Sequence, residues 1–317
     1  MARTTSQNYP RIHDENDRYH GFLDESKLAK HAKKISEKEL KNIIRQAIQY
    51  ANKKSSRAIL NIPDSADKQE IIDIYVNEGK ELFKYFQKYC GDPASTAHDC
   101  LNRHYSVVAR EQFRNRTLQK ERMNSGWRYQ SIAKDAAIAS NRFMAVSDIG
   151  ATEADFNAVI GVEKSTTPLN IYVSVKNRTN TMGGQDWPKA IRALEEMAKA
   201  DKNRTGPYIC IFGIAMEKGT RSIKNESKTK QPYSFNTELW LSDFFWPFFS
   251  NYAYEDVIKA VLDVLLEQEG DNNGLEVHIP DELIESFGAT CREYDLIDKD
   301  GKFNNAYKLV DLFCGKL

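Results

Sequence analysis

We expect the chain to be organised around the stretch TEADFNAVIGVEKSTTPLNIYVSVKNRTNTMGGQDW, Thr152 to Trp187. It contains two apolar runs that alternate as β-strands do, Asp155 to Val162 and Asn170 to Lys176, and a short polar segment joins them. This pattern predicts a β-hairpin. Because an antiparallel hairpin brings the start of its first strand beside the end of its second, we expect Asp155 to lie near Lys176.

Helical periodicity dominates the chain before this hairpin. Ser36 with Glu39 forms a capping-box signal at the start of the first helix, whereas residues 1–25 read as an irregular arm. The tripeptide NSG at Asn124 to Gly126 is expected to end the third helix. The other predicted helices in this part are Gln69 to Tyr89, Ser95 to Met123 and the Ala-rich Tyr129 to Arg142.

After the hairpin, strands and helices alternate. The nearly continuous apolar run Pro207 to Met216 is typical of a central strand buried on both faces. A further strand is predicted before the hairpin, at Phe143 to Ser147. After the hairpin, a strand is predicted at Thr237 to Ser242, and helices at Trp187 to Asp201, at Tyr254 to Gln268 and twice after Ile279. The order indicates an α/β or α+β fold with a central mixed sheet flanked by helices and a helical N-terminal region. We expect three segments: 1-128, 129-269 and 270-317.

Composition limits the class of protein. The chain has 317 residues, a formal net charge of zero and no apolar run long enough to cross a bilayer, so we expect a cytoplasmic protein that does not enter a membrane. Its five cysteines are scattered, which favours reduced thiols. Residues 266–317 hold twelve Asp and Glu against five Lys and Arg, so the basic remainder is the better candidate for binding phosphates.

Asp155 and Lys176 together form a candidate catalytic pair. A carboxylate can hold Mg²⁺, which lowers the pKa of a bound water, and a neighbouring lysine can orient that water and stabilise the charge that develops on phosphorus. The pair therefore predicts hydrolysis of phosphodiester bonds. The alternative is that Asp155 is a solvated residue at a strand start and Lys176 a charge at a strand end.

These residues resemble a known family. Asp155 at a strand start, then SVK at Ser174 to Lys176, NRTNT and a helix, is similar to the PD-(D/E)xK nucleases and most similar to type II restriction endonucleases, over roughly residues 130–215. The resemblance implies a restriction-endonuclease-like mixed sheet, Mg²⁺ as cofactor, Asp155 as metal ligand and Lys176 as catalytic lysine. It also implies cleavage of double-stranded DNA at a specific site by a homodimer, with which a two-fold symmetric target is consistent.

Ser174 departs from the family pattern, in which an acidic residue stands two positions before the lysine. Because a hydroxyl is a weak ligand for Mg²⁺, a second carboxylate must come from elsewhere. Glu195, on the predicted helix, is the first candidate, and Asp186, at the start of that helix, is the second. Glu195 could equally be a helix residue that faces solvent.

Several basic and amide side chains are candidates for DNA contacts. Arg110 and Arg114 lie one turn apart on a predicted basic helix, Arg178 and Asn180 follow the catalytic lysine, and Arg221 belongs to a basic polar loop. Each could instead belong to an ordinary solvated surface. The aromatic run Phe244 to Phe249 could stack on bases, although core or dimer contacts are the commoner use.

Other interpretations stay open. Cys90, His98, Cys100 and His104 are residue types that zinc accepts, but their spacing favours inert thiols and satisfied histidines. A DNA repair or junction-resolving nuclease of the same fold is an alternative function. A non-catalytic DNA-binding protein on a nuclease fold is another, and Ser174 motivates it.

Overall fold

The computed structural model of the chain describes residues 9–13, 19–54, 62–63, 65–89, 91–150, 153–179, 187–268 and 279–317. These residues form a mixed α/β structure with nine α-helices and a six-stranded mixed sheet. The chain divides into two compact units, which are Met1–Lys53 with Asn124–Gly270, and Lys54–Met123 with Asp271–Leu317. This division replaces the three consecutive segments expected from the sequence, because the C-terminal segment folds together with residues from the first third of the chain.

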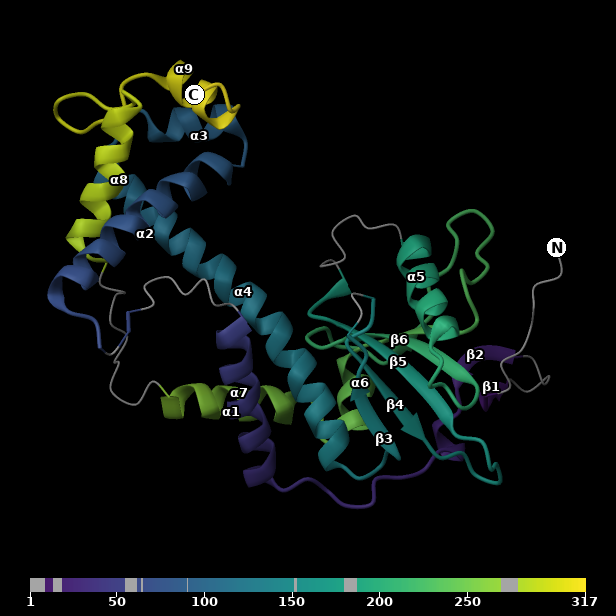
Figure 1. The fold of residues 1–317 in the computed structure, drawn as a ribbon. Coiled ribbons are helices and arrows are strands. Elements are labelled where there is room, and N and C mark those ends of the chain that lie inside the picture. Colours follow the sequence, from purple (N-terminus) through teal and green to yellow (C-terminus); the bar gives the residue numbers. More distant parts are fainter. Residues whose placement is uncertain are drawn as a thin grey trace. The chain divides into compact units, whose positions relative to one another are not determined.

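The six-stranded sheet belongs to the first unit and confirms the predicted hairpin. Its strand order is β3-β4-β5-β6-β8-β7, of which Figure 1 labels the first four strands. The first three strands are antiparallel neighbours, β6 and β8 run parallel to β5, and β7 closes the edge antiparallel to β8. The strands are β3 (Ala145–Asp148), β4 (Phe156–Ile160), β5 (Leu169–Lys176), β6 (Tyr208–Ile214), β7 (Arg221–Ser222) and β8 (Thr237–Trp240).

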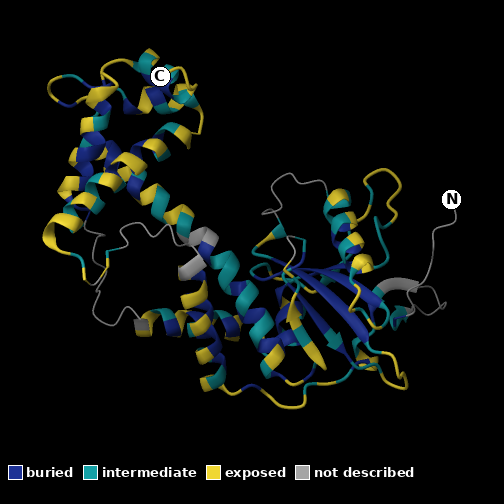
Figure 2. Cartoon of the chain, viewed as in Figure 1, coloured by how far each residue is buried: buried dark blue, intermediate teal, exposed yellow. Residues whose placement is uncertain are grey.

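Helices cover both faces of this sheet, so its central strands are buried throughout (Figure 2). Side chains alternate along β5: Tyr172 packs in the cluster of α5 (Trp187–Ala200), whereas Ile171 and Val173 pack in the cluster of the opposite face. That opposite face is covered by α1 (Glu37–Lys54), α4 (Tyr105–Ala139), α6 (Ser242–Ser250) and α7 (Tyr254–Gln268). Two separate apolar layers therefore fix the position of β5.

The aromatic run Phe244 to Phe249 forms most of α6 and is part of the core. Phe245, Phe248 and Phe249 are almost completely buried, and the indole of Trp246 donates a hydrogen bond to the carbonyl of Ala215 over 2.8 Å. Burial removes these rings from any contact with DNA bases. They supply core packing instead, the commoner of the uses that the sequence left open.

The N-terminal arm is ordered where the structure describes it, which corrects the expectation of an irregular segment. It contains β1 (Arg11–His13), β2 (Tyr19–Leu23) and a 3₁₀ turn at Glu25–Lys27. The amide of Leu23 donates to the carboxylate of Glu238 on β8, and the carbonyl of Leu23 accepts from Arg221 over 2.6 Å. Both partners are distant in sequence, so local patterns could not reveal these bonds.

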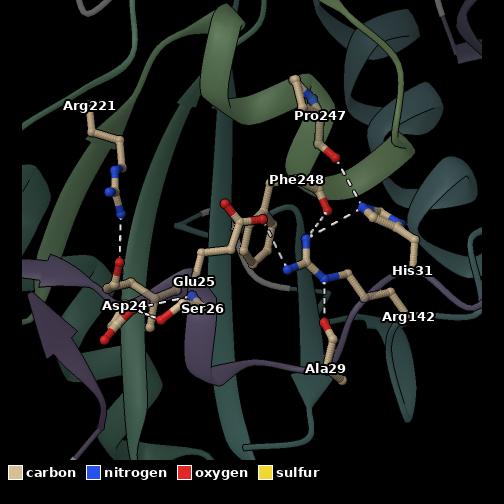
Figure 3. A network of polar contacts seen from close by, with 10 residues as sticks. Asp24, Glu25, Ser26, Ala29, His31, Arg142, Arg221, Pro247 and Phe248 are labelled. Atoms are coloured by element: carbon tan, nitrogen blue, oxygen red, sulfur yellow. Dashed lines mark hydrogen bonds and ion pairs between the residues drawn. The ribbon is translucent and has the colours of Figure 1, made fainter.

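A buried arginine ties the next part of the arm to the core (Figure 3). The side chain of Arg142 is 2% exposed and donates to the carbonyls of Ala29 (2.7 Å) and Phe248 (2.9 Å) and to the carboxylate of Glu25 (3.0 Å). His31 lies beside it, with its Nε2 3.0 Å from the carbonyl of Pro247. Arg142 therefore joins three segments of the first unit.

The second unit is helical. It contains α2 (Lys68–Lys88), α3 (Pro93–Cys100), the first part of α4, α8 (Asp281–Glu293) and α9 (Ala306–Phe313). Phe83, Phe86 and Phe287 meet edge to face in its core. The predicted helices after Ile279 are thus confirmed. In the described parts of both units, no helix has the length and apolar character that crossing a bilayer requires.

One long helix, α4, corrects two predicted boundaries. The predicted helix Ser95 to Met123 is interrupted between Cys100, where α3 ends, and Tyr105, where α4 begins, although no break was expected there. α4 then continues through Asn124 to Gly126, where the sequence predicted a helix end. Partners in the fold stabilise this polar tripeptide in helical form: Asn124 Nδ2 donates to Asn52 Oδ1 over 3.3 Å, and Ser125 Oγ accepts from Asn177 over 2.8 Å. Tertiary contacts outweigh the local preference of these residues for a turn.

Candidate active site

Asp155 lies where β4 begins, and its carboxylate reaches the end of β5. The backbone amide of Asp155 donates to the carbonyl of Val173 over 2.8 Å, and its Oδ2 accepts from the amide of Val175 over 2.6 Å. The carboxylate therefore occupies a position that a backbone carbonyl would fill in a regular ladder. This bond places it beside the peptide that joins Ser174 to Val175, one residue before Lys176.

Ser174 and Lys176 follow Tyr172 on the α5 side of β5, because residues two apart on a strand share a face. Ser174 is 1% exposed, while Lys176 is half-buried at the last position of the strand. Lys176 pairs with Ile214, the last residue of β6. The lysine thus stands at the carboxyl end of two parallel strands, at the boundary between the core and solvent.

Glu217 lies at the same end of the sheet and was missed by the sequence reasoning. Its Oε2 accepts from the backbone amide of Thr179 (2.8 Å) and from the Thr179 hydroxyl (2.7 Å). These two bonds, with a smaller contribution from Arg178, hold the pKa of Glu217 below its usual value. A usable signal existed, since Glu217 is the first acidic residue after β6, and the carboxyl ends of parallel strands meet at one edge.

Glu195 lies elsewhere in the fold, so it does not complete a metal site with Asp155. Its Oε1 accepts from the hydroxyls of Ser234 and Thr237, the latter over 2.7 Å. Thr237 pairs with Cys210 on β6, whereas Lys176 pairs with Ile214, four residues further along the same strand. Thr237 therefore lies roughly 13 Å from Lys176 in the direction of the strands. The expected role of Glu195 as metal ligand is corrected: it is a buried structural acceptor.

The residues at the end of β5 fit Mg²⁺ only with help from substrate. Mg²⁺ is commonly bound by one or two carboxylates together with phosphate oxygens and waters. Asp155 supplies one carboxylate, and across the described ranges no three His, Cys, Asp or Glu side chains gather into a ready-made metal site. Asp186, the other expected ligand, lies outside the described residues. Phosphate oxygens and waters would therefore complete the coordination shell.

The expected DNA contacts lie in different parts of the chain. Arg178 is exposed directly after the candidate site, and Asn180 lies outside the described residues. Arg110 and Arg114 are exposed on the part of α4 that belongs to the second unit, where Arg110 pairs with Asp281 over 3.6 Å. Arg110 and Arg114 remain candidates for contacts with the phosphate backbone of DNA.

Arg221 is corrected from a loop contact to a structural residue. Its guanidinium packs over the rings of Phe22 and Phe244, at 5.1 and 4.2 Å from their centroids, and donates to the carbonyl of Leu23. Its side chain is only 16% exposed. The segment that contains it forms β7 and a hairpin in which Asn225 bridges to Pro232, instead of one extended loop.

The possible zinc ligands do not come together among the described residues. The His98 side chain is 86% exposed on α3, whereas Cys100 is buried in the core of the second unit, which raises its pKa to about 11. His104 Nδ1 lies 2.8 Å from the Ser106 hydroxyl. Cys90 lies outside the described residues.

Comparisons with known proteins add no family to this geometry. No protein-family model matches the chain, and no curated protein has a significant sequence match to it. The residues at the end of β5 are therefore the basis for assigning a function.

Proposed function

We propose that the chain is a Mg²⁺-dependent endonuclease that hydrolyses phosphodiester bonds in double-stranded DNA, of the type II restriction class that its sequence resembles. One observation carries the proposal. The hydrogen bond from the Val175 amide to Asp155 Oδ2 fixes a carboxylate beside the strand end that bears Ser174 and Lys176. The mixed sheet with helices on both faces is the arrangement that the resemblance implies.

Each residue at the strand end has a role in this reaction. Asp155 would hold the metal ion, which when bound polarises the phosphate and acidifies a water. Lys176 is placed to orient the attacking water and to stabilise the negative charge that develops on the phosphate oxygens. Ser174 contributes at most a weak oxygen ligand. Arg178, exposed two residues after the lysine, would neutralise a backbone phosphate.

Plasmid digestion with purified protein tests the proposal. With Mg²⁺ the wild type should yield discrete fragments. Asp155→Asn keeps an acceptor for the Val175 amide but removes the charge, and Lys176→Ala removes the ammonium, so each should lower the cleavage rate by about a hundredfold or more while DNA binding persists. Lys202→Ala is the matched control, because Lys202 is an exposed lysine that follows α5, away from β5's end.

The products separate the rival functions. Smeared or structure-selective products would indicate a repair or junction-resolving enzyme of the same fold. DNA binding without cleavage in Mg²⁺ or Mn²⁺ would indicate a non-catalytic binding protein and overturn the enzyme assignment. Full activity in Lys176→Ala would remove that lysine from the mechanism. A two-fold symmetric duplex site suits a homodimer, which sedimentation equilibrium would detect.

A further inference from the structure

Three polar atoms on the α4 side of the sheet are buried without hydrogen-bond partners. They are Asn124 Oδ1, Arg128 Nε and Asn177 Oδ1. Leaving a buried polar group unpaired forfeits its hydrogen bonds to water, so folded proteins hold few of them. Asn124 and Arg128 are one helical turn apart on α4, and Asn177 directly follows Lys176. The Asn124 amide bonds Asn52 on α1, so Arg128 and Asn177 are the two orphaned side chains to consider beside this strand end.

The position of Asn177 links this place to the candidate active site. Consecutive residues at a strand end point to opposite faces, so Asn177 turns toward α4 while Lys176 lies on the α5 side. The contact is direct, because Asn177 Nδ2 donates to Ser125 Oγ over 2.8 Å. Ser125 is three residues before Arg128, and side chains at this spacing are neighbours on a helix surface. Ser125 and Asn177 are thus in contact at the end of β5, and Arg128 lies about one turn further along the same helix.

The Arg128 guanidinium, together with the Asn177 amide in its rotated form, suits an anion. Arg128 is a half-buried cation, and its Nε lacks a partner. Rotating the Asn177 amide by half a turn would let the Ser125 hydroxyl donate to Oδ1 and would place Nδ2, with its two hydrogens as donors, where Oδ1 now lies. A guanidinium on α4 and an amide after β5 then both supply donors, a chemistry suited to a phosphate oxygen.

We propose that Arg128 and Asn177, with Ser125 orienting the amide, bind a backbone phosphate adjacent to the one cleaved at Asp155. The inference rests on the proposed function for the identity of the anion as a phosphodiester of DNA. A DNA strand that crosses the end of β5 would place one phosphate at Lys176 and the neighbouring phosphate at Asn177. Arg128 is a positioning residue in this arrangement, because it holds the strand without touching the reacting atoms.

Binding to a duplex of about 30 base pairs and mixed sequence, measured by fluorescence anisotropy in EDTA over a range of salt concentrations, tests the inference without cleavage. Loss of one phosphate contact reduces the slope of log K against log salt by about 1. Arg128→Gln should show this reduction and bind about tenfold more weakly. Arg45→Ala is the control, since Arg45 pairs with Glu267 on the same unit and its loss should leave the slope unchanged.

Asn177→Asp supplies an independent variant of nearly the same shape, which decides the question if Arg128→Gln does not fold. Its carboxylate would repel the phosphate, so the slope and the affinity should both fall. Unchanged slopes in folded variants of a wild type that cleaves DNA would overturn this inference alone. Reduced slopes in a protein that binds but never cleaves would support it and overturn the nuclease assignment. A wild type that neither binds nor cleaves would overturn both.

Discussion

The stability of the first unit should fall as pH rises toward 8 because of one buried carboxyl group. Glu238 on β8 is completely buried and accepts from the Leu23 amide and, over 2.7 Å, from the Trp240 indole. Burial raises the pKa of Glu238 from 4.5 to about 7, although these bonds and Arg221 oppose the shift. The folded state therefore prefers the protonated form more strongly than the unfolded state does.

The sign and size of the effect follow from this difference. Because the folded pKa lies above the unfolded one, the contribution of Glu238 to stability is fully present below about pH 4.5 and is lost as pH rises through about 7. The rise in pKa corresponds to about 3 kcal/mol of unfolding free energy. Glu238→Gln cannot titrate, so the stability of the wild type relative to this variant should decline by about that amount between pH 4.5 and 8.

Urea unfolding followed by tryptophan fluorescence, at intervals of half a pH value, measures this difference. The amide of the variant faces the Trp240 indole with a second donor, which costs stability at every pH and therefore drops out of the pH dependence. A difference between wild type and Glu238→Gln that stays constant within about 0.5 kcal/mol from pH 4.5 to 8 would contradict this prediction. Such a result would show that the pKa of Glu238 is the same in the folded and unfolded states.

Three other changes test the packing of the first unit. Burial and the nearby Arg142 lower the pKa of His31, so the stability that neutral His31 supports should be lost as pH falls below about 6.5, and His31→Gln should flatten that part of a melting curve against pH. Arg142→Met leaves buried carbonyls unpaired and should cost about 3 kcal/mol or more in urea unfolding. Gly213→Ala would place a methyl group 2.2 Å from the Phe245 ring, so calorimetry should show a loss of about 1 to 3 kcal/mol.

The central part of the fold could be predicted because its pattern is local. Alternation over Asn170 to Lys176 and the apolar run at Pro207 to Met216 reflect burial on each strand, and both appear as β5 and β6 within two residues of the expected bounds. The proximity of Asp155 to the end of β5 followed from antiparallel pairing alone. The roles of Asp155 and Lys176 in catalysis remain predictions.

The remaining features depend on contacts between residues far apart in sequence. The continuation of α4 through Asn124 to Gly126 depends on Asn52 and Asn177, and the order of the N-terminal arm depends on Glu238. No local pattern encodes such partners. The position of Glu195 on α5 could be predicted from helical spacing. The bond of its carboxylate with Thr237 could not, because Thr237 is distant in sequence.

The bond from the Val175 amide to Asp155 also offers a spectroscopic view of the candidate site. A cation at the carboxylate would withdraw electron density from the oxygen that accepts this proton, and the amide would weaken its bond in response. The ¹⁵N and ¹H shifts of Val175, and the exchange rate of its proton with solvent, would therefore report occupancy at Asp155 in the absence of any DNA. Titration of isotopically labelled protein with Mg²⁺ or Ca²⁺ could thus measure the affinity of the site separately from every later step.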